Sequence, residues 1–363
     1  MYESKQIPVS LDRIRSLFPD GEWHGMSADN FIGVADDSRK VVKGGIFVAI
    51  AGFDTDGHLY LDNACRAGAA LIVVSRKIFN ELKHTSCGIE SSPRLEIDDT
   101  RKAASILAAE FYANPTKEIA IHGITGTKGK TTTVHLVGEI LYSAGKKPAM
   151  MGTLGVEFGS EKIKTSLTTP GPIEFNAIVR SLVESGATDV VCEVSAHAGA
   201  LKRTSDVRFE TVTYMNLSRD HGDHFPNAEY LDAKLEIARD AVLINPDVFG
   251  IGNARDPHTQ SFLQPIEQTR RFTFSSWEEG EDTSKIQSDL KAIISGRSLK
   301  GIHLTIETSG WSRVISLPLI GRFNAQNAAA AASIATVIGI DPDVISSGLE
   351  NTRPNGSRIF QTR

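Results

Sequence analysis

The segment from Glu118 to Gly145 constrains the fold more than any other part of this sequence. An apolar, β-branched run, EIAIHGI, leads into the stretch TGTKGKTTT, after which Val134, Val137 and Leu141 recur at helical spacing. A loop between a buried strand and a helix start directs free backbone N–H groups and the positive end of the helix dipole at one point, which suits phosphate. The segment therefore predicts an α/β domain with a phosphate-binding loop.

The spacing within this loop departs from the Walker A pattern. That pattern places a glycine five residues before Gly-Lys-Thr, where this chain has Ile124. A dinucleotide-binding GxGxxG loop is excluded by the spacing of Gly126 and Gly129, whereas a tight turn without ligand stays an alternative. In a phosphate loop, Lys130 would provide a mobile positive charge toward the β- and γ-phosphates, and the Thr131 hydroxyl could ligate magnesium.

Length and charge limit the classes of protein. A chain of 363 residues exceeds what one hydrophobic core usually supports, so two or three domains are expected. The net charge of -5, with both signs interspersed, gives no overall attraction to nucleic acid or to an anionic membrane. We therefore expect neither nucleic-acid binding nor membrane insertion.

Cysteine usage and the apolar runs predict a cytoplasmic protein. Cys65, Cys87 and Cys192 are far apart and form no CxxC, so neither a disulfide framework nor a zinc site is indicated. The amino terminus lacks the pattern of a signal peptide. The longest apolar run, 328–340, is shorter than the roughly 20 residues that cross a bilayer, and it predicts a buried helix.

Alternating strand and helix patterns predict an α/β architecture with a largely parallel sheet. A plausible linker, YANPTKE, separates two such regions, and GIHLTIET and WSRVISLPL flank Ser309-Gly310 as a hairpin. The acidic stretch SSWEEGEDTSK is expected to be an exposed loop. A helix is predicted at 100–112, and further strands are predicted at 44–50, 70–75, 189–195, 210–216 and 247–253.

Three groups of polar residues beyond the loop could carry chemistry. Glu193 follows an apolar run at the predicted carboxyl end of a strand, where it could hold Mg²⁺ or simply be solvated. The loop NLSRDHGDHF contains Asp220, His221, Asp223 and His224, which could form a metal or proton-handling site or a polar loop. Lys234 lies in a probable helix, where most lysines are solvated.

Two turns offer further polar groups. SLTTPGP (166–172) presents hydroxyls on a constrained loop, although threonine is ordinary in turns that contain proline. GRFNAQN (321–327) places Asn324 and Asn327 about one turn apart at a helix start, where capping would explain Asn324.

The order of these pieces resembles the Mur ligases of cell-wall synthesis, and the TTP, EVSAHA and NLSRDH forms look like the MurE type. Those ligases carry a shortened loop, GTxGK(T/S), so the missing Walker glycine is expected. DDSRKVVKGGIFVAIAGFDTDGH is similar to the uridine-binding domain of that type. The resemblance implies three parts: a UDP-sugar-binding domain at 1–113, an ATP-binding central domain with a mostly parallel sheet flanked by helices at 114–358, and the start of a linker at 359–363.

The resemblance further implies an ATP-dependent, ADP-forming amide ligase that adds lysine or diaminopimelate to UDP-N-acetylmuramoyl-L-alanyl-D-glutamate through an acyl phosphate. Lys130, Glu193, His221 and Lys234 match the catalytic residues, and Lys234 matches the lysine that the family carbamylates. Thr131, Glu193, His221 and Lys234 match magnesium ligands. ATP-binding positions match Gly126, Thr127, Lys128, Gly129, Lys130, Thr131, Thr132, Asn324 and Asn327. Positions for the UDP-sugar peptide match Ser38, Arg39, Thr168, Thr169, Ser195 and Arg203.

The segment RPNGSRIFQTR resembles the junction at which these ligases pass into a third domain that closes over ATP. We therefore expect nucleotide binding with little turnover from the chain alone. Two alternatives stay open. The chain could be a catalytically silent homologue that binds nucleotide or the UDP-sugar peptide and pairs with a complete ligase, or it could be another ligase of the MurF or folylpolyglutamate synthase type.

Overall fold

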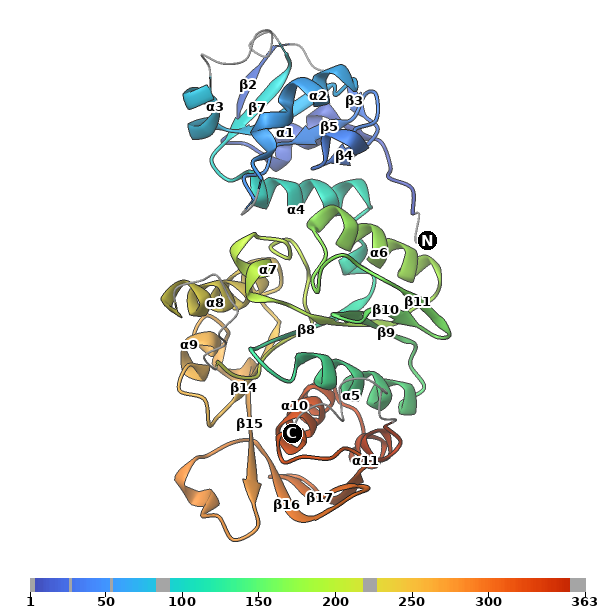
Figure 1. Cartoon of the computed structure of the whole chain (residues 1–363), viewed down its shortest axis with the longest axis vertical. Helices are drawn as coiled ribbons and strands as arrows, with labels where there is room; N and C mark the ends of the chain where they lie inside the picture. The colour runs from blue at the N-terminus through green and yellow to red at the C-terminus, as the bar shows by residue number, and fades with distance from the viewer. Residues whose placement is uncertain (1–3, 26–27, 53–54, 83–91, 218–226, 353–363) are drawn as a thin grey trace. The chain divides into compact units, whose positions relative to one another are not determined.

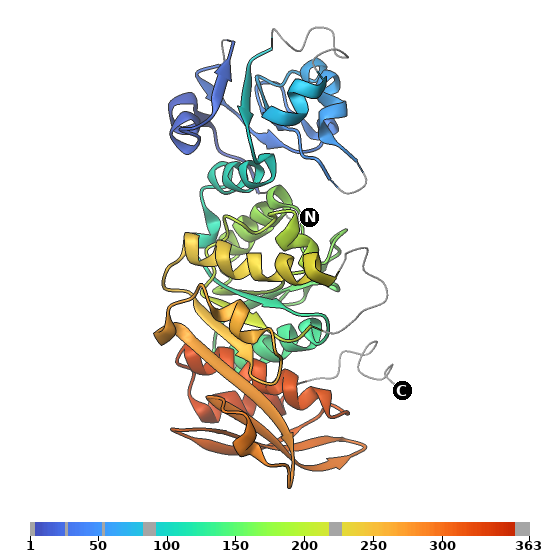
Figure 2. The ribbon, with the colours of Figure 1, turned by 90° about the vertical axis from the view of Figure 1, so that its left-hand side faces the viewer.

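A computed structural model describes residues 4–25, 28–52, 55–82, 92–217 and 227–352 of the chain. Two compact units are present (Figures 1 and 2). Unit 1 comprises residues up to Glu118 together with Pro170–Glu184 and Leu201–Asp206, and unit 2 comprises Ile119–Thr169, Ser185–Ala200 and the rest from Val207. The two units are defined by which segments pack together, and their segments alternate along the chain. They therefore do not test the domain bounds at residues 113 and 358, which stay predictions.

Unit 1 contains a five-stranded sheet in the order β2-β7-β6-β5-β4, in which only the β2–β7 pair is antiparallel. β1 and β3 form a separate antiparallel pair. The strands are β1 (Val9–Ser10), β2 (Glu22–His24), β3 (Asn30–Phe31), β4 (Val34–Ala35), β5 (Ile46–Val48), β6 (Leu71–Ser75) and β7 (Arg94–Ile97). The α-helices are α1 (Leu11–Leu17), α2 (Leu61–Arg66), α3 (Arg76–Leu82), α4 (Thr100–Phe111) and α6 (Pro172–Glu184), and the short 3-10 helices are η1 (Ser38–Lys40), η2 (Gly57–Tyr60) and η4 (Pro115–Lys117).

Alternation along the strands of unit 1 divides its core between the two faces of the sheet. Ile46 and Val73 point to the face that α4 covers, in a cluster with Leu107. Phe47 and Val74 belong to a separate cluster on the opposite side, with residues of α2 and α3. Both faces are therefore buried, which explains why β5 and β6 read as continuous apolar runs.

Unit 2 contains an eleven-stranded sheet in the order β11-β10-β9-β12-β8-β13-β14-β15-β16-β17-β18. The seven strands from β9 to β16 in this order are parallel, and antiparallel strands extend both edges. The strands are β8 (Ala120–Thr125), β9 (Pro148–Gly152), β10 (Gly155–Phe158), β11 (Glu161–Ile163), β12 (Asp189–Glu193), β13 (Thr211–Tyr214), β14 (Phe249–Asn253), β15 (Arg271–Glu278), β16 (Leu290–Ser298), β17 (Gly301–Thr308) and β18 (Ser312–Leu317).

Helices cover both faces of this sheet. α5 and α10 lie on one face and α8 on the other (Figures 1 and 2). The largest core cluster joins the first face to α5, α10 and α11 through residues such as Ile124, Val137 and Ile334. The helices of unit 2 are α5 (Lys130–Ser143), α7 (Ala196–Ala200), α8 (Asn227–Ile244), α9 (Thr259–Leu263), α10 (Phe323–Val337) and α11 (Pro342–Glu350), with 3-10 helices η5 (Gln268–Arg270) and η6 (Thr283–Lys285).

The predicted α/β class and the mostly parallel sheet are confirmed. The buried helix expected at 328–340 is confirmed over 328–337, where α10 ends, and the hairpin around Ser309-Gly310 joins β17 to β18. The exposed loop expected for SSWEEGEDTSK is wrong at its start, because Ser275 and Trp277 are buried in β15. Among the described residues, no helix combines the length and apolar character needed to span a membrane.

We predict that Gly348→Ala destabilises unit 2. A Cβ added at Gly348 in α11 would lie 2.5 Å from the Cα of Ile140 in α5, so the two helices would have to separate. Alanine favours an isolated helix by about 1 kcal/mol, but forcing apart a packed contact costs roughly 1–3 kcal/mol. Urea unfolding should show a net loss of stability. Gly310→Ala is the control, since its Cβ would meet nothing within 4 Å; equal midpoints for both variants would contradict the prediction.

Candidate active site

The glycine loop connects β8 to α5 as the sequence predicts. Gly126 (φ 155°) and Gly129 (φ 91°) adopt positive φ values that other residues rarely take. A Cβ at Gly126 would lie 2.7 Å from the Cβ of Met215, and one at Gly129 would collide with the side-chain oxygen of Asn327. Glycine is therefore required at both positions by conformation and by space.

Lys130, the first residue of α5, folds back over this loop. Its Nζ donates to the carbonyl oxygens of Gly126 (2.8 Å) and Thr127 (3.3 Å). The ammonium group is thus held at the loop by two weak neutral acceptors. An anion placed before the amino end of α5 would offer it a stronger, charge-assisted bond.

Glu193 is the last residue of β12, the strand that pairs directly with β8. Its side chain is buried, and Oε1 accepts hydrogen bonds from the Thr131 hydroxyl (2.8 Å) and from the backbone N–H of Thr153 (2.9 Å). The Thr153 hydroxyl donates to Oε2 (3.2 Å). The solvated-glutamate alternative is therefore wrong, because the carboxylate is buried against the first turn of α5.

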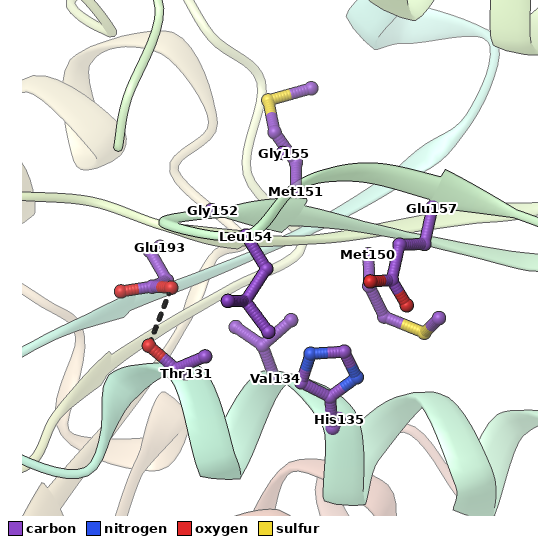
Figure 3. A pocket seen from close by; sticks show the side chains of 10 residues that line it. All are labelled: Thr131, Val134, His135, Met150, Met151, Gly152, Leu154, Gly155, Glu157 and Glu193. Atoms are coloured by element: carbon purple, nitrogen blue, oxygen red, sulfur yellow. Dashed lines mark hydrogen bonds between the residues drawn. The ribbon is translucent and has the colours of Figure 1, made fainter. Parts of the chain in front are cut away.

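The hairpin between β9 and β10 shapes the space around this carboxylate. Figure 3 shows the Glu193 side chain between the first turn of α5 and the hairpin, with Leu154 beside it and His135 farther along α5. A Cβ at Gly152 would collide with the Glu193 carboxylate, so this glycine makes the room that the acid occupies. Burial lowers the pKa of His135, which favours its neutral form.

These side chains fit a magnesium ion by the chemistry of their donors. The Thr131 hydroxyl and the Glu193 carboxylate are hard oxygen ligands at the end of a phosphate-type loop, which is the donor set that Mg²⁺ prefers. Of the other two predicted metal ligands, His221 lies outside the described residues, as do Asp220, Asp223 and His224.

Lys234 is completely buried in α8, and its Nζ lies 4.4 Å from the centre of the Tyr230 ring. The solvated helical lysine is thus excluded as an interpretation. Lysine is rarely buried in full, so this position calls for a specific explanation. A role as a metal ligand stays a prediction.

Asn324 and Asn327 lie in the first two turns of α10. Asn324 does not cap the helix, because the helix begins at Phe323 and the Asn324 amide donates to the carbonyl of Ile320 (2.9 Å). The Asn327 amide donates to Asn324 Oδ1 (3.0 Å), and the Asn327 oxygen abuts Gly129. The structure therefore places this pair against the glycine loop.

The threonines of the TTP turn have different settings. Thr169 is buried, and its hydroxyl donates to the carbonyl of Glu193 (2.9 Å) while accepting from the N–H of Ser195 (3.0 Å). Thr168 is half-buried, with its hydroxyl 3.3 Å from that of Thr153. Thr169 therefore fixes the chain after β12, and Thr168 lies beside the hairpin residue that bonds Glu193.

In unit 1, the DDSR motif forms a short polar turn. Ser38 is buried at the start of η1, and the Asp37 side chain caps η1 by accepting from the N–H of Arg39 (2.9 Å). The exposed Arg39 guanidinium pairs with the same carboxylate and lowers its pKa to about 2. Arg39 is thus available at the surface and already oriented by its neighbour.

Arg203 belongs to the segment Leu201–Asp206 of unit 1. Burial lowers its pKa, and the nearby charge of Asp36 opposes this effect. Asp36 also lies near Gly171, the residue after the TTP turn, since a Cβ there would be 3.7 Å from its Oδ2. Sequence reasoning missed Asp36, which brings together segments that are more than 130 residues apart.

Asn216 is a second residue that sequence reasoning left without a role. It follows β13 and forms hydrogen bonds with Thr127 and Lys128 of the glycine loop. Thr153 is the third such residue. Asn216 begins the NLSRDHGDHF motif but is not itself titratable, and Thr153 belongs to no motif. Their importance is visible only from the loop and the carboxylate they hold.

Both units contain regions that match models of one known protein family. A model of the "Mur ligase middle domain" matches residues 124–335, which is more than half of the chain, and one of the "Mur ligase family, catalytic domain" matches residues 30–112. The chain belongs to the Mur ligase family. The resemblance drawn from the motifs is thereby confirmed.

Two related Mur ligases are named UDP-N-acetylmuramoyl-L-alanyl-D-glutamate–2,6-diaminopimelate ligase. The protein of Syntrophomonas wolfei is 35% identical over 318 residues, covering 87% of this chain and 61% of its own length. That of Geobacter metallireducens is 32% identical over 347 residues, covering 94% and 64%. The chain therefore spans about three fifths of the length of these relatives.

A solved structure supports the same fold. It carries the same ligase name and superposes with a TM-score of 0.77 at 22% sequence identity. The match covers 97% of this chain and 68% of the other.

We predict that Asp206 makes the stability of unit 1 depend on pH. Burial raises its pKa from an ordinary 3.8 to about 6. The folded state therefore binds this proton more tightly than the unfolded state. The protonated Asp206 contributes fully to the free energy of unfolding below pH 3.8, and this contribution is lost as the pH rises through 6. The free energy of unfolding should fall between pH 4 and pH 7.5, and this fall should be smaller in Asp206→Asn than in the unmodified protein by on the order of 1–3 kcal/mol.

Urea unfolding at both pH values, followed by the fluorescence of Trp23 in β2, measures this difference. Asp20→Asn changes an exposed carboxylate of the same unit and serves as the control. An identical pH dependence in Asp206→Asn and the unmodified protein would contradict the prediction.

Proposed function

We propose that this chain provides the UDP-sugar-binding and ATP-binding parts of a MurE-type ligase. The reaction would join 2,6-diaminopimelate to the D-glutamyl carboxylate of UDP-N-acetylmuramoyl-L-alanyl-D-glutamate, the substrates in the names of its relatives. The observation that carries the proposal is the contact between Thr131 of the glycine loop and the buried Glu193. It supports the proposal because the glycine loop and the carboxylate lie at the carboxyl ends of neighbouring parallel strands, β8 and β12.

The chemistry would proceed in two displacements. The D-glutamyl carboxylate attacks the γ-phosphorus of ATP and ADP leaves, giving an acyl phosphate. The amino group of diaminopimelate then attacks the acyl carbon, loses a proton and expels phosphate, giving the amide. The first step brings two anionic groups together, and the second develops negative charge on the acyl oxygen as the neutral amine adds. The protein therefore contributes mainly positioning and charge neutralisation.

Each described residue has a definite part in this proposal. The amino end of α5 and Lys130 would hold the phosphates, with Lys130 exchanging its carbonyl acceptors for phosphate oxygens. Thr131 and Glu193 would hold Mg²⁺, which screens the repulsion between phosphate and carboxylate when bound. Asn327, which abuts Gly129, would lie on the nucleotide side of the loop.

The remaining predicted residues belong to the proposal as well. Thr168, Ser195 and Arg203 would bind the sugar peptide, with the guanidinium suited to a carboxylate. Ser38 and Arg39 would face the uridine part. Carbamylation of Lys234 would convert a buried cation into an oxygen ligand, and its complete burial supports this idea because burial favours the neutral amine that reacts.

Binding and turnover measurements test the proposal together. The chain should bind MgATP and UDP-N-acetylmuramoyl-L-alanyl-D-glutamate, and mass spectrometry should be used to look for the tripeptide product when diaminopimelate is added. Lys130→Ala should weaken MgATP binding roughly 10- to 100-fold, the worth of a charge-assisted bond, and leave binding of the UDP-sugar peptide unchanged.

Exposed Lys300 provides the matched control as Lys300→Ala. Product that disappears in Lys130→Ala supports the ligase. Binding of both ligands without product supports the silent homologue instead, and failure to bind the UDP-sugar peptide overturns both.

A second prediction concerns magnesium. Gly152→Ala should push the Glu193 carboxylate away from Thr131, since the added methyl group occupies its place. ADP affinity without metal should stay close to that of the unmodified protein, whereas the gain in affinity on adding Mg²⁺ should fall at least several-fold. Calorimetry with and without Mg²⁺ measures both quantities, and Gly310→Ala is the control. An undiminished magnesium effect would remove Glu193 from the metal site.

A further inference from the structure

Asn216 is bonded to the glycine loop through both its side chain and its backbone. Its Oδ1 accepts from the N–H of Lys128 (3.0 Å), and its Nδ2 donates to the carbonyl of Lys128 (3.0 Å). Its own carbonyl accepts from the N–H of Thr127 (3.0 Å). One asparagine thus bonds three of the backbone polar groups of Thr127 and Lys128 at the tip of the loop.

The segment that carries Asn216 is itself firmly held. The carbonyl of the preceding Met215 accepts from the side-chain amides of Asn253 in β14 and Gln326 in α10, both at 3.1 Å. The N–H of the following Leu217 donates to Asp256 (2.8 Å). Asn216 is therefore fixed to elements that lie outside the loop, and the loop is fixed to Asn216.

These bonds determine which amides remain for a ligand. The N–H groups of Thr127 and Lys128 both point to Asn216 acceptors. The first N–H groups of a helix have no acceptor within the helix, and in α5 these include Thr131 and Thr132. An anion at this site would therefore meet donors from the start of α5 and not from the tip of the loop.

We propose that Asn216 is a positioning residue that holds the glycine loop in its phosphate-binding shape before nucleotide arrives, leaving the amides of the α5 start as the phosphate donors. This inference rests on the proposed function and deepens it. A loop that is already ordered loses less conformational entropy on binding the di- or triphosphate, so affinity increases without any contact between Asn216 and the ligand.

Removal of the side chain tests this role. Asn216→Ala loses two of the three bonds, and the dissociation constants of MgATP and MgADP should rise roughly tenfold. Affinity for the UDP-sugar peptide and the thermal midpoint should stay close to those of the unmodified protein, which a general loss of structure would not allow. Asn351→Ala, which removes an exposed amide bonded to Ser347 in α11, is the control.

Amide hydrogen exchange in the unmodified full chain measures directly whether the bonds to Asn216 protect the loop amides. Without nucleotide, the amides of Thr127 and Lys128 should already be protected, and addition of MgADP should newly protect Thr131 and Thr132. In Asn216→Ala, protection of Lys128 should be lost while Thr127 keeps its backbone acceptor. A freely exchanging Lys128 amide in the nucleotide-free protein overturns the inference even if the variant fails to fold.

The outcomes separate this inference from the function beneath it. No MgATP binding by the unmodified chain overturns the proposed function, and the inference with it. Normal MgATP binding by both the unmodified chain and Asn216→Ala overturns the inference alone. A selective loss of nucleotide affinity in Asn216→Ala, with the exchange pattern described, supports both.

Discussion

The close fit of the glycine loop, which follows β8, against two separate segments is the constraint on which the site depends. Gly126 lies against Met215 and Gly129 against Asn327, and neither place has room for a Cβ. The loop can adopt this conformation only if β8, β13 and α10 are all correctly placed. The conformation of the glycine loop is therefore a product of the tertiary structure, even though its sequence signature is local.

The same dependence holds for Glu193. A buried carboxylate is costly unless its oxygens are hydrogen-bonded, and here the bonds come from Thr131 in α5 and from Thr153 in the β9–β10 hairpin. The antiparallel hairpin is thus more than an extension of the sheet edge. It fixes the acid against the first turn of α5, directly after the glycine loop.

Local pattern was sufficient to predict the strand-loop-helix unit, the parallel sheet and the position of Glu193 at a strand end. Each of these follows from periodicity or from a rule about sheet edges. Thr153 and Asn216 could not be found in this way, because their partners are 40 and 88 residues away. The carboxyl end of β15 was wrongly expected to be a loop for a different reason: Ser275 is polar in sequence, but its hydroxyl accepts a hydrogen bond from the Trp277 indole within the core.

β12 carries a buried acid at each end: Asp189 at its amino end and Glu193 at its carboxyl end. The groups that bond each acid explain why only the carboxyl end suits a metal ion. At the amino edge, Asp189 contacts Lys146 (2.9 Å) and His122 (3.2 Å). Burial would raise the pKa of Asp189, but hydrogen bonds from His122, Thr188 and Lys146 outweigh it and lower the pKa to about 2.

An added cation at that edge would have to displace a cation that is already present. At the carboxyl edge, the described partners of Glu193 are hydroxyl and amide groups, which carry no net charge. A divalent ion at Glu193 would therefore replace neutral donors and would not have to displace any of the charged groups that Asp189 holds.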